Sequence, residues 1–560
     1  MDPIKEIEAL ISHGRYLEAS HAAKGQLKTS DELQLKQLYA LSMSKSGTPE
    51  AARDFLEPIY KNGDPDPETA GILGSIYKEL FRKGQSSSFA ALSRDTYLAN
   101  YQATGSYYTG INAASMSAML MQSSKSKEIA RQIIAKLKDS TRTFWEIVTL
   151  AEAYLLLKER QAALDTYATA RKIAGSDWGP VMSVHRQLWL LNHYLPVPKE
   201  LMAMFEPPRV AAFVGHMIDH PTRSVPRFLP SMENAVAHAI RQNIERLKIQ
   251  VGYCSLACGS DILFAEAMTE AGGAVNILLP FDVSDFVEQS VRFAGEHWVE
   301  RFQNLVRKYP VSFVTKESYD GDNDLFSLQG KVILGSAVLQ SKSFQSEPIL
   351  LTVLAQTDLV IKEGGTRHMV NNWPYPATHV NVGLESLASG AGAGKGTGEK
   401  PLKNMQVKRP VQFLIRVDLA SISTLEREKV LKSIDLKTSE ESSPCYRFAD
   451  GNTAWILSLD YETGAIEILK MLNSSKQGRQ LAIVLHAGPV DKDGEATDGG
   501  VLEQLRLIAG YSMPGVTLAS HTFATLLALL PSQFEVEYSS TISGSDGEEI
   551  PVYKVTSSAS

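Results

Sequence analysis

The fold of the middle of this chain is decided by residues 250–266, QVGYCSLACGSDILFAE. A short apolar run ends at Ser255, a loop of small residues follows, and Asp261 opens a stretch with helical spacing of apolar residues. The same order of strand, loop and helix begins at Val210 and ends near Leu247. Strands that alternate with helices in this way predict a parallel sheet with helices on both faces.

Outward from this stretch, the sequence predicts four parts. Residues 1–205 form a helical repeat domain, 206–382 the parallel α/β domain, 383–408 a linker, and 409–560 a further domain with both strands and helices. A length of 560 residues fits three or four domains of ordinary size. The expected fold class is therefore multidomain, α followed by α/β.

The first 205 residues show small and apolar residues at three- and four-residue steps, with Pro and Gly between the segments. Leu38 and Leu73 hold equivalent places in two copies of this pattern, close to the tetratricopeptide repeat length of about 34. The clearest copy holds Leu150, Ala151, Tyr154, Ala163, Tyr167 and Ala170. These windows predict an α-helical repeat solenoid, with a generic helical bundle as the alternative. Solenoids present extended surfaces to protein partners.

Composition excludes several classes of protein. The net charge is −7, which argues against a general nucleic-acid or anionic-membrane binder. Cys254, Cys258 and Cys445 are too few for a disulfide scaffold, and the first two are interpreted as core thiols. The sequence shows neither a signal peptide nor an apolar run long enough for a membrane span. A cytoplasmic location is expected.

The linker holds one misleading motif, Gly392-Ala393-Gly394-Lys395-Gly396-Thr397, which is similar to a phosphate-binding loop. Such a loop needs a strand before it and a helix after it. Here the preceding residues are a poor strand and Pro401 follows closely, so we interpret this Gly-rich stretch as a flexible linker.

Three loops of the α/β domain follow predicted strands and contain glycine or small polar residues: Gly215–Asp219, Cys258–Asp261 and Gly364–Thr366. Ligands of open α/β sheets bind beyond the carboxyl ends of the strands. The last two loops can direct backbone N–H groups at an anion. The alternative is structural, since Asp261 is also a plain helix-capping residue.

The strings Phe213–Asp219, Ala257–Phe264 and Gly364-Gly365-Thr366 resemble the Rossmann-like, nucleotide-sensing relatives of the lysine decarboxylase-like family. Tyr107–Ala114 is similar to the TRAF-binding region of apoptosis signal-regulating kinases. The resemblance implies a nucleotide or nucleotide-derived ligand, and the absence of a Glu after Thr366 favours sensing over hydrolysis. The expected ligand-binding residues are Gly215, His216, Asp219, Arg227, Cys258, Gly259, Ser260, Asp261, Gly364, Gly365 and Thr366.

The strings Leu485–Val490 and Pro514–Ser520 resemble a class III adenylate or guanylate cyclase domain, which implies a ferredoxin-like α+β fold. The resemblance makes Asp418 and Asp450 vestigial ligands of Mg²⁺ and Arg506 a vestigial transition-state residue. The ribose-orienting Asn of the family falls on Leu502, so the domain is expected to be catalytically impaired. Asp418 and Asp450 could equally be turn residues.

Taken together, the sequence predicts a signalling or scaffold protein that binds protein partners through its repeats and senses a nucleotide-type ligand. An active cyclase and a pure interaction scaffold are the alternatives. Cyclase sites of the family form at a dimer interface, which allows a homodimer.

Overall fold

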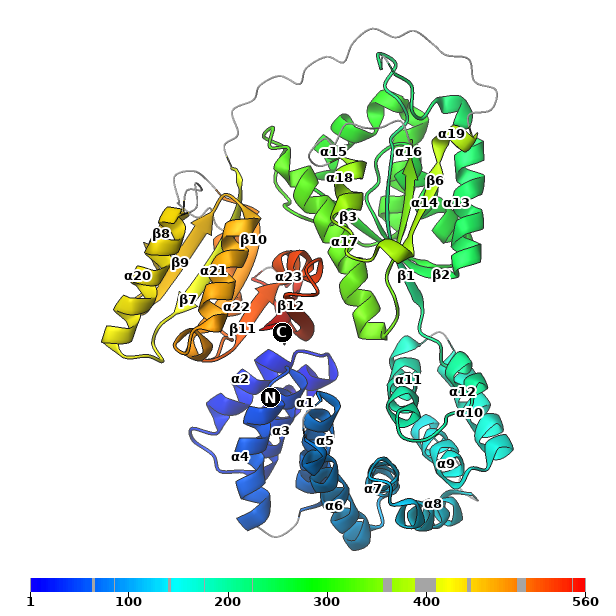
Figure 1. Cartoon of the computed structure of the whole chain (residues 1–560), viewed down its shortest axis with the longest axis vertical. Helices are drawn as coiled ribbons and strands as arrows, with labels where there is room; N and C mark the ends of the chain where they lie inside the picture. The colour runs from blue at the N-terminus through cyan, green and yellow to red at the C-terminus, as the bar shows by residue number, and fades with distance from the viewer. Residues whose placement is uncertain are drawn as a thin grey trace. The chain divides into compact units, whose positions relative to one another are not determined.

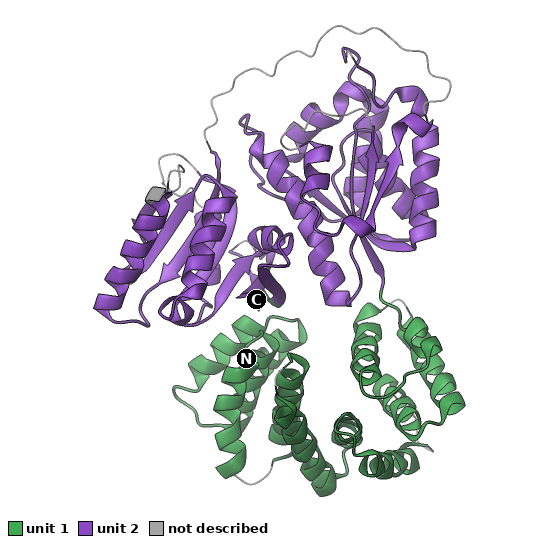
Figure 2. Ribbon diagram, in the orientation of Figure 1, with its two compact units in different colours: residues 1–207, 539–541 green, residues 208–538, 542–560 purple. Residues whose placement is uncertain are grey.

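The structure is a computed structural model that describes residues 2–558 except 63–65, 85, 139–142, 176, 224, 356–364, 388–408, 441–444, 491–499 and 546. The chain divides into two compact units (Figure 2). Unit 1 comprises Met1–Pro207 with Ser539–Thr541, and unit 2 comprises Pro208–Tyr538 with Ile542–Ser560. The predicted linker and the phosphate-loop-like string lie largely or wholly within 388–408, outside the described residues.

Unit 1 is built from helices that pack consecutively against one another (Figure 1). Helices α3 and α5 begin 34 residues apart, at Leu33 and Pro67, and so do α9 and α11, at Phe144 and Trp178. This period confirms the prediction of helical repeats. The helices are α1 (Pro3–Ser12), α2 (Tyr16–Gln26), α3 (Leu33–Lys45), α4 (Pro49–Asn62), α5 (Pro67–Arg82), α6 (Ser87–Thr104), α7 (Tyr107–Met119), α8 (Ser123–Leu137), α9 (Phe144–Leu157), α10 (Arg160–Ala174), α11 (Trp178–Asn192) and α12 (Lys199–Met204).

Small residues let neighbouring repeat helices approach closely. A Cβ on Gly74 of α5 would lie 2.9 Å from the ring of Tyr97, and one on Gly110 of α7 would lie 2.7 Å from the ring of Tyr101. Both tyrosines belong to α6, so a tyrosine fills the space that each glycine leaves. The repeat therefore alternates small and aromatic residues, as its sequence pattern predicts.

Unit 2 begins with a six-stranded sheet in the order β4-β3-β2-β1-β5-β6, and every neighbouring pair is parallel. The chain runs from β1 outward to β4 and then returns to β5 on the other side of β1, so the winding direction reverses between β1 and β5. The strands are β1 (Arg209–Gly215), β2 (Ile249–Cys254), β3 (Ala274–Leu279), β4 (Val311–Phe313), β5 (Ile349–Leu354) and β6 (His379–Gly383).

Helices cover both faces of this sheet, as predicted (Figure 1). Arg301 of α16 pairs with Glu266 of α14 and Glu233 of α13, which fixes these three helices side by side on one face. Helix α17 packs across β1, β2 and β3 on the other face. The helices are η1 (Pro230–Met232), α13 (Glu233–Leu247), α14 (Ser260–Glu270), α15 (Val283–Ser290), η2 (Arg292–Ala294), α16 (Glu296–Lys308), α17 (Asp324–Phe344), α18 (Thr366–Asn371), η3 (Pro376–Thr378) and α19 (Leu384–Leu387).

A second sheet, of seven strands, follows in the order β12-β13-β11-β10-β7-β9-β8. Antiparallel pairing joins β10 to β7, β7 to β9 and β9 to β8, whereas β10 and β11 are parallel. The sheet is therefore mixed, and its first four strands alternate with helices as β-α-β-β-α-β. Its elements are β7 (Val411–Asp418), α20 (Thr424–Glu440), β8 (Cys445–Ala449), β9 (Ala454–Leu459), α21 (Glu462–Ser474), η4 (Gly478–Gln480), β10 (Ala482–Pro489), α22 (Val501–Ala509), β11 (Thr517–Ser520), α23 (His521–Ala528), β12 (Phe534–Ser543) and β13 (Glu549–Ser557).

Within unit 2, helix α17 of the parallel-sheet part also packs against α23 of the mixed-sheet part. Gly335 leaves no room for a Cβ against the backbone of Thr525, and Ser336 Oγ lies 2.9 Å from His521 Nε2. Lys331 forms an ion pair with Glu462. The residues of both sheets consequently belong to one continuous hydrophobic core.

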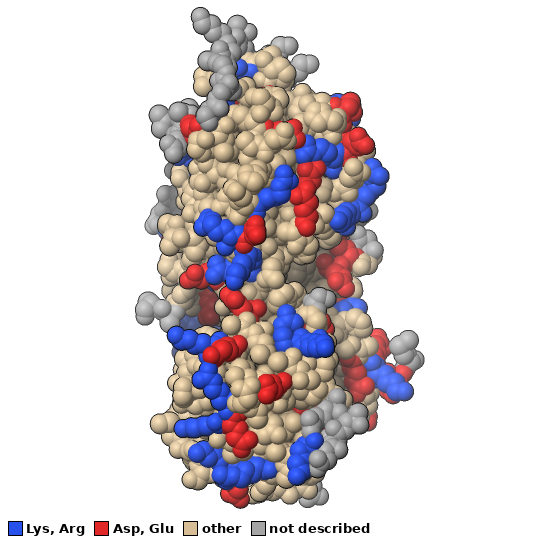
Figure 3. Space-filling view, turned by 90° about the vertical axis from the view of Figure 1, so that its right-hand side faces the viewer, with Lys and Arg blue, Asp and Glu red and all other residues tan. Residues whose placement is uncertain are grey.

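On the face of the molecule shown in Figure 3, basic and acidic side chains are interspersed rather than gathered into a patch of one sign. Among the described residues, no helix combines the length and the apolar composition that crossing a lipid bilayer requires.

Candidate functional site

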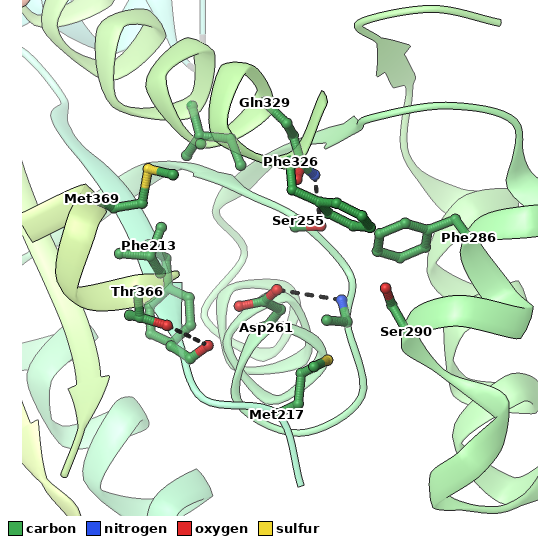
Figure 4. Close-up of a pocket in the computed structure, with 15 residues that line it drawn as sticks. Phe213, Met217, Ser255, Asp261, Phe286, Ser290, Phe326, Gln329, Thr366 and Met369 are labelled. Atoms are coloured by element: carbon green, nitrogen blue, oxygen red, sulfur yellow. Dashed lines mark hydrogen bonds between the residues drawn. The ribbon is translucent and has the colours of Figure 1, made fainter. Parts of the chain in front are cut away.

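A cavity of about 140 Å³ lies at the carboxyl ends of the parallel strands, beside the point where the winding reverses between β1 and β5. This is the place where open α/β sheets bind their ligands. Apolar and aromatic side chains form most of its wall, with a few polar groups among them (Figure 4). It is lined by Phe213, Val214, Gly215, Met217, Ser255, Ala257, Asp261, Phe286, Ser290, Phe326, Gln329, Gly330, Ile333, Thr366 and Met369.

Asp261 is the one ionisable side chain among the described residues that line this cavity. It stands in the first turn of α14 and is 8% exposed. Its Oδ2 accepts a hydrogen bond from the backbone N–H of Ala257 at 3.3 Å. Burial raises the pKa of this carboxyl to about 7, against which the Ala257 hydrogen bond acts weakly. A carboxyl group with a pKa near neutrality in a cavity is a functional-site candidate.

The opposite wall carries an amide that is held in place from two strands. Gln329 of α17 donates from Nε2 to Ser255 Oγ at 2.8 Å and to the carbonyl of Leu278 at 2.6 Å. Both amide hydrogens are therefore engaged, and the side-chain oxygen is the acceptor that remains. Thr366, in the first turn of α18, donates to the carbonyl of Gly215 at 3.4 Å.

Two predicted glycines serve the close packing of the loops at this edge. A Cβ on Gly259 would lie 2.6 Å from the backbone N of Ile218, and one on Gly215 would collide with Ser260. Gly259 also has φ +102°, a conformation that favours glycine. The space beside both residues is thus filled by the protein itself, because the loops after β1 and β2 contact each other there.

The loop after β1 is closed by its own acidic residue. Asp219 accepts hydrogen bonds at Oδ2 from the backbone N–H groups of Arg227 at 2.6 Å and Phe228 at 2.9 Å. Its Oδ1 lies 3.3 Å from Arg223 Nε. Asp219 therefore has the role of a turn-stabilising residue, and Arg227 approaches it through its backbone.

The predicted thiol of this site, Cys258, lies in the core. It is fully buried, its N–H donates to the carbonyl of Ser290 at 2.9 Å, and burial raises its pKa to about 12. Burial also raises the pKa of Cys254. Both cysteines are protonated at neutral pH, in agreement with their interpretation as core thiols.

Of the predicted ligand-binding residues, the structure brings Gly215, Asp261 and Thr366 to the cavity wall. His216, Asp219, Arg227, Cys258, Gly259, Ser260 and Gly365 are placed in the surrounding loops, and they do not line it. Ser260 bonds the carbonyl of His216, which joins two of these loops. Gly364 and the predicted strand Thr357–Ile361 lie outside the described residues.

Sequence reasoning missed Gln329, Ser255 and the aromatic wall formed by Phe286 and Phe326. Gln329 lies in a helix whose other core-facing residues are apolar or small, such as Leu325, Val332 and Ile333. A lone buried amide in such a helix was the available signal.

The acidic residues of the mixed sheet form a second candidate site. Asp450, in the turn between β8 and β9, accepts from Arg416 Nε at 2.6 Å and from Arg506 Nε at 2.9 Å. Burial by itself would raise the pKa of Asp450, but the two arginines hold it below its ordinary value. Asp418, at the end of β7, accepts from the N–H of Ala420 at 2.9 Å and from Thr453 Oγ1 at 3.2 Å.

Leu502, at the place where the resemblance requires Asn, is 3% exposed and packs in the core from α22. Arg506 lies one helical turn further along and pairs with Asp450. In the described part of the chain, no group of three or more His, Cys, Asp or Glu side chains could hold a metal ion.

Comparison with known proteins identifies the repeat region. Residues 15–117 match the model of a family described as Tetratricopeptide Repeats-Sensor. The N-terminal region is thus of the tetratricopeptide type, a kind of repeat that acts as a protein-interaction scaffold. No match to this chain was found among curated proteins.

Solved structures show distant likenesses. A thermophilic tetratricopeptide repeat protein from Thermus thermophilus is 18% identical, with 34% of this chain and 98% of that chain covered and a TM-score of 0.29. A tetratricopeptide repeat protein from Parabacteroides merdae is 10% identical, with 36% and 82% covered and a TM-score of 0.25. The catalytic core of a rhodopsin-guanylyl cyclase is 13% identical, with 27% and 97% covered and a TM-score of 0.22.

Proposed function

We propose that this protein is a helical-repeat scaffold that binds protein partners and carries a sensor domain for a nucleotide-type small molecule. The observation that carries the proposal is the cavity beside β1 and β5, with the buried carboxyl of Asp261 in its wall. The sensor domain is the Rossmann-like part of unit 2, and the domain after it is a ferredoxin-like, cyclase-type module without catalysis.

The cavity supports ligand binding by both its place and its lining. Small-molecule sites combine an apolar wall with a few oriented polar groups, and they favour switch points of α/β sheets. Here Gln329 is held by two hydrogen bonds before any ligand arrives. A preorganised polar group loses little freedom on binding, which favours affinity.

The repeats support the other half of the proposal. The description of the matched family model names both tetratricopeptide repeats and a sensor. Stacked helical pairs offer an extended surface on which a partner can bind while a separate domain binds the ligand. We infer that the partner binds to the repeat domain and the small molecule to a different domain.

The contacts in the mixed-sheet domain favour a regulatory module over an active cyclase. Asp450 is paired with two arginines, and Leu502 is packed where a ribose contact would be needed. This set of donors does not fit a two-metal site, because a carboxylate with two cationic partners is a poor metal ligand. Mg²⁺ at Asp418 and Asp450 stays a prediction, and the proposal includes no step through it.

The test is a thermal-shift screen on the full chain with ATP, GTP, NAD and cyclic nucleotides. A ligand that binds only the folded state raises the free energy of unfolding, by about 2.7 kcal/mol at a hundredfold excess over Kd, and thereby raises Tm. We expect at least one of these compounds to raise Tm. If none does at millimolar concentration, the sensor half of the proposal is wrong and the pure scaffold replaces it.

A further inference from the structure

The cavity beside Asp261 is too small for a whole nucleotide. Its volume is about 140 Å³, whereas drug-sized ligands occupy about 300–1,000 Å³ and a cavity of about 150 Å³ is filled by benzene. The cavity therefore matches one small planar ring system of a ligand, and the remainder of a larger ligand has to lie outside it.

The wall of the cavity is suited to a flat ring. Phe286 and Phe326 face it together (Figure 4). Phe326 is positioned by an edge-on contact with Phe281, whose ring centroid lies 5.3 Å away. Aromatic side chains pack on planar rings by offset stacking or edge-to-face contact. The cavity thus offers apolar and aromatic surface to the faces of a ring.

Two of the polar groups in the cavity wall offer oxygen atoms as acceptors, and they indicate what the edge of the ring must provide. Asp261 presents a carboxyl group, and Gln329 presents its side-chain oxygen because its amide hydrogens are engaged by Ser255 and Leu278. Asp261 is 8% exposed and Gln329 is 6% exposed, so a ligand that left them without partners would forfeit a substantial part of its binding energy.

No Lys, Arg or His occurs among the described residues that line the cavity. Among these residues a phosphate group would meet a carboxyl group and no cation, which disfavours it electrostatically. The phosphate end of a nucleotide does not belong in this cavity.

We propose that the cavity takes the nucleobase of the ligand, and that the base is one with an exocyclic amino group whose N–H donors bind Asp261 and Gln329. This rests on the proposed function, and it assigns the orientation and the chemical class of the ligand. Adenine, guanine and cytosine carry such an amino group, whereas uracil does not.

The experiment compares nucleosides with a sugar phosphate by calorimetric titration of the full chain at pH 6 and pH 8. The probes are adenosine, guanosine, cytidine, uridine and ribose 5-phosphate. The two pH values bracket the pKa of Asp261. Among the described residues, this carboxyl interacts electrostatically with the thiols of Cys254, from β2, and Cys258, from the loop after β2. The raised pKa of each thiol keeps both protonated at either pH.

We expect at least one amino-bearing nucleoside to bind at least tenfold more tightly than uridine and ribose 5-phosphate. Asp261→Asn keeps the size of the side chain and should raise the Kd of that nucleoside at least tenfold. The matched control is Asp282→Asn, since Asp282 is a partly exposed residue that caps α15 and lies away from the cavity wall.

The outcomes separate this inference from the proposed function. If uridine or ribose 5-phosphate binds as tightly as the amino-bearing nucleosides, or if Asp261→Asn binds as the native chain does, the assigned orientation is wrong although a sensor remains. If no nucleoside and no nucleotide binds, both proposals fail together.

Discussion

Asp261 and Asp450 occupy comparable places in the two sheets of unit 2, and their surroundings are opposite. Asp261 lies in the first turn of the helix after β2 and is buried in a cavity wall, where the described lining residues include no cation. Asp450 stands in a turn of the mixed sheet and is bonded by Arg416 and Arg506. Burial raises the pKa of the first carboxyl to about 7, while the two arginines keep that of the second low. A buried carboxyl group with a pKa near neutrality is a candidate for a functional role, whereas one bonded by two arginines has a structural role at hand.

The largest loss of stability is expected from replacing a glycine near Asp261, compared with a glycine beside Asp450. Gly259→Ala places a Cβ 2.6 Å from the backbone of Ile218 at φ +102°, so we expect a loss of about 3–5 kcal/mol in the free energy of unfolding. Gly451→Ala is the matched control beside Asp450, since its φ is +85° but open space surrounds it, and it should cost about 1 kcal/mol. Urea unfolding of both variants measures the difference, and equal losses would contradict the close packing of the two loops.

Replacing each carboxyl group with an amide should change the free energy of unfolding in opposite directions at the two positions. The unfolded pKa of Asp261 is near 3.8 and the folded value is about 7, so its burial penalty is absent below about pH 4, grows up to about pH 7 and is complete above that. Asp261→Asn should therefore stabilise the protein at pH 8 by on the order of 3 kcal/mol, and by little at pH 4. Asp450→Asn removes the charge that the two arginines bond, and it should destabilise the protein at pH 8 by about 1–2 kcal/mol.

Thermal unfolding at both pH values distinguishes the two replacements. A loss of stability in Asp261→Asn at pH 8 would mean that the buried carboxyl has a partner that offsets its burial.

A smaller difference should separate the two arginines that bond Asp450. The side chain of Arg416 is 14% exposed and that of Arg506 is 47% exposed. Arg416→Met should cost about 1–2 kcal/mol, because a buried charged hydrogen bond is lost, while Arg506→Met should cost about 0.5 kcal/mol or less. Denaturant titrations of the two variants give the comparison. A greater loss of stability in Arg506→Met would contradict the prediction that Arg416 is the stronger partner of Asp450.

The smallest effect is expected from a catalytic test. The full chain with ATP or GTP and Mn²⁺ should make no cyclic nucleotide above background, because Leu502 is buried and Asp450 is paired with arginines. Asp418→Ala should leave that background unchanged. Robust synthesis that Asp418→Ala abolishes would instead establish the active cyclase, the main alternative that the sequence left open.

Much of the fold follows from local sequence patterns. In residues 409–560 the alternating apolar runs predict strands at 411–417, 453–459, 480–486 and 516–519, and these overlap β7, β9, β10 and β11. The sequence also predicts strands at 210–214, 250–255 and 275–279, which overlap β1, β2 and β3, because each is a short apolar run that ends in a loop or at a proline. By contrast, β4, β5, β6 and α17 were not predicted, since very short strands, a fully buried strand and a helix buried over most of its length lack a clear period.

The candidate site was predictable in part for a related reason. Gly215 ends β1, and Asp261 lies in the first turn of the helix that follows β2. The topology rule places such residues at one edge of the sheet. Gln329 comes from the middle of α17, and no local rule connects it with Ser255, 74 residues away. Gly215 and Gly259 are expected ligand-binding residues, and in the structure they make room for neighbouring side chains and loops. A homodimer and a cytoplasmic location stay predictions.

Helix α17 packs against the parallel sheet and also against helix α23 of the mixed-sheet part. Gln329 and Ile333 of this helix line the cavity. Gly335 and Ser336 contact α23, and Lys331 pairs with Glu462 at the start of α21. Cutting the chain between the two sheets would strip the covering from one side of this helix and expose apolar surface to water. The two sheets should consequently melt in a single cooperative transition, and a fragment that ends before β7 should be insoluble or aggregate.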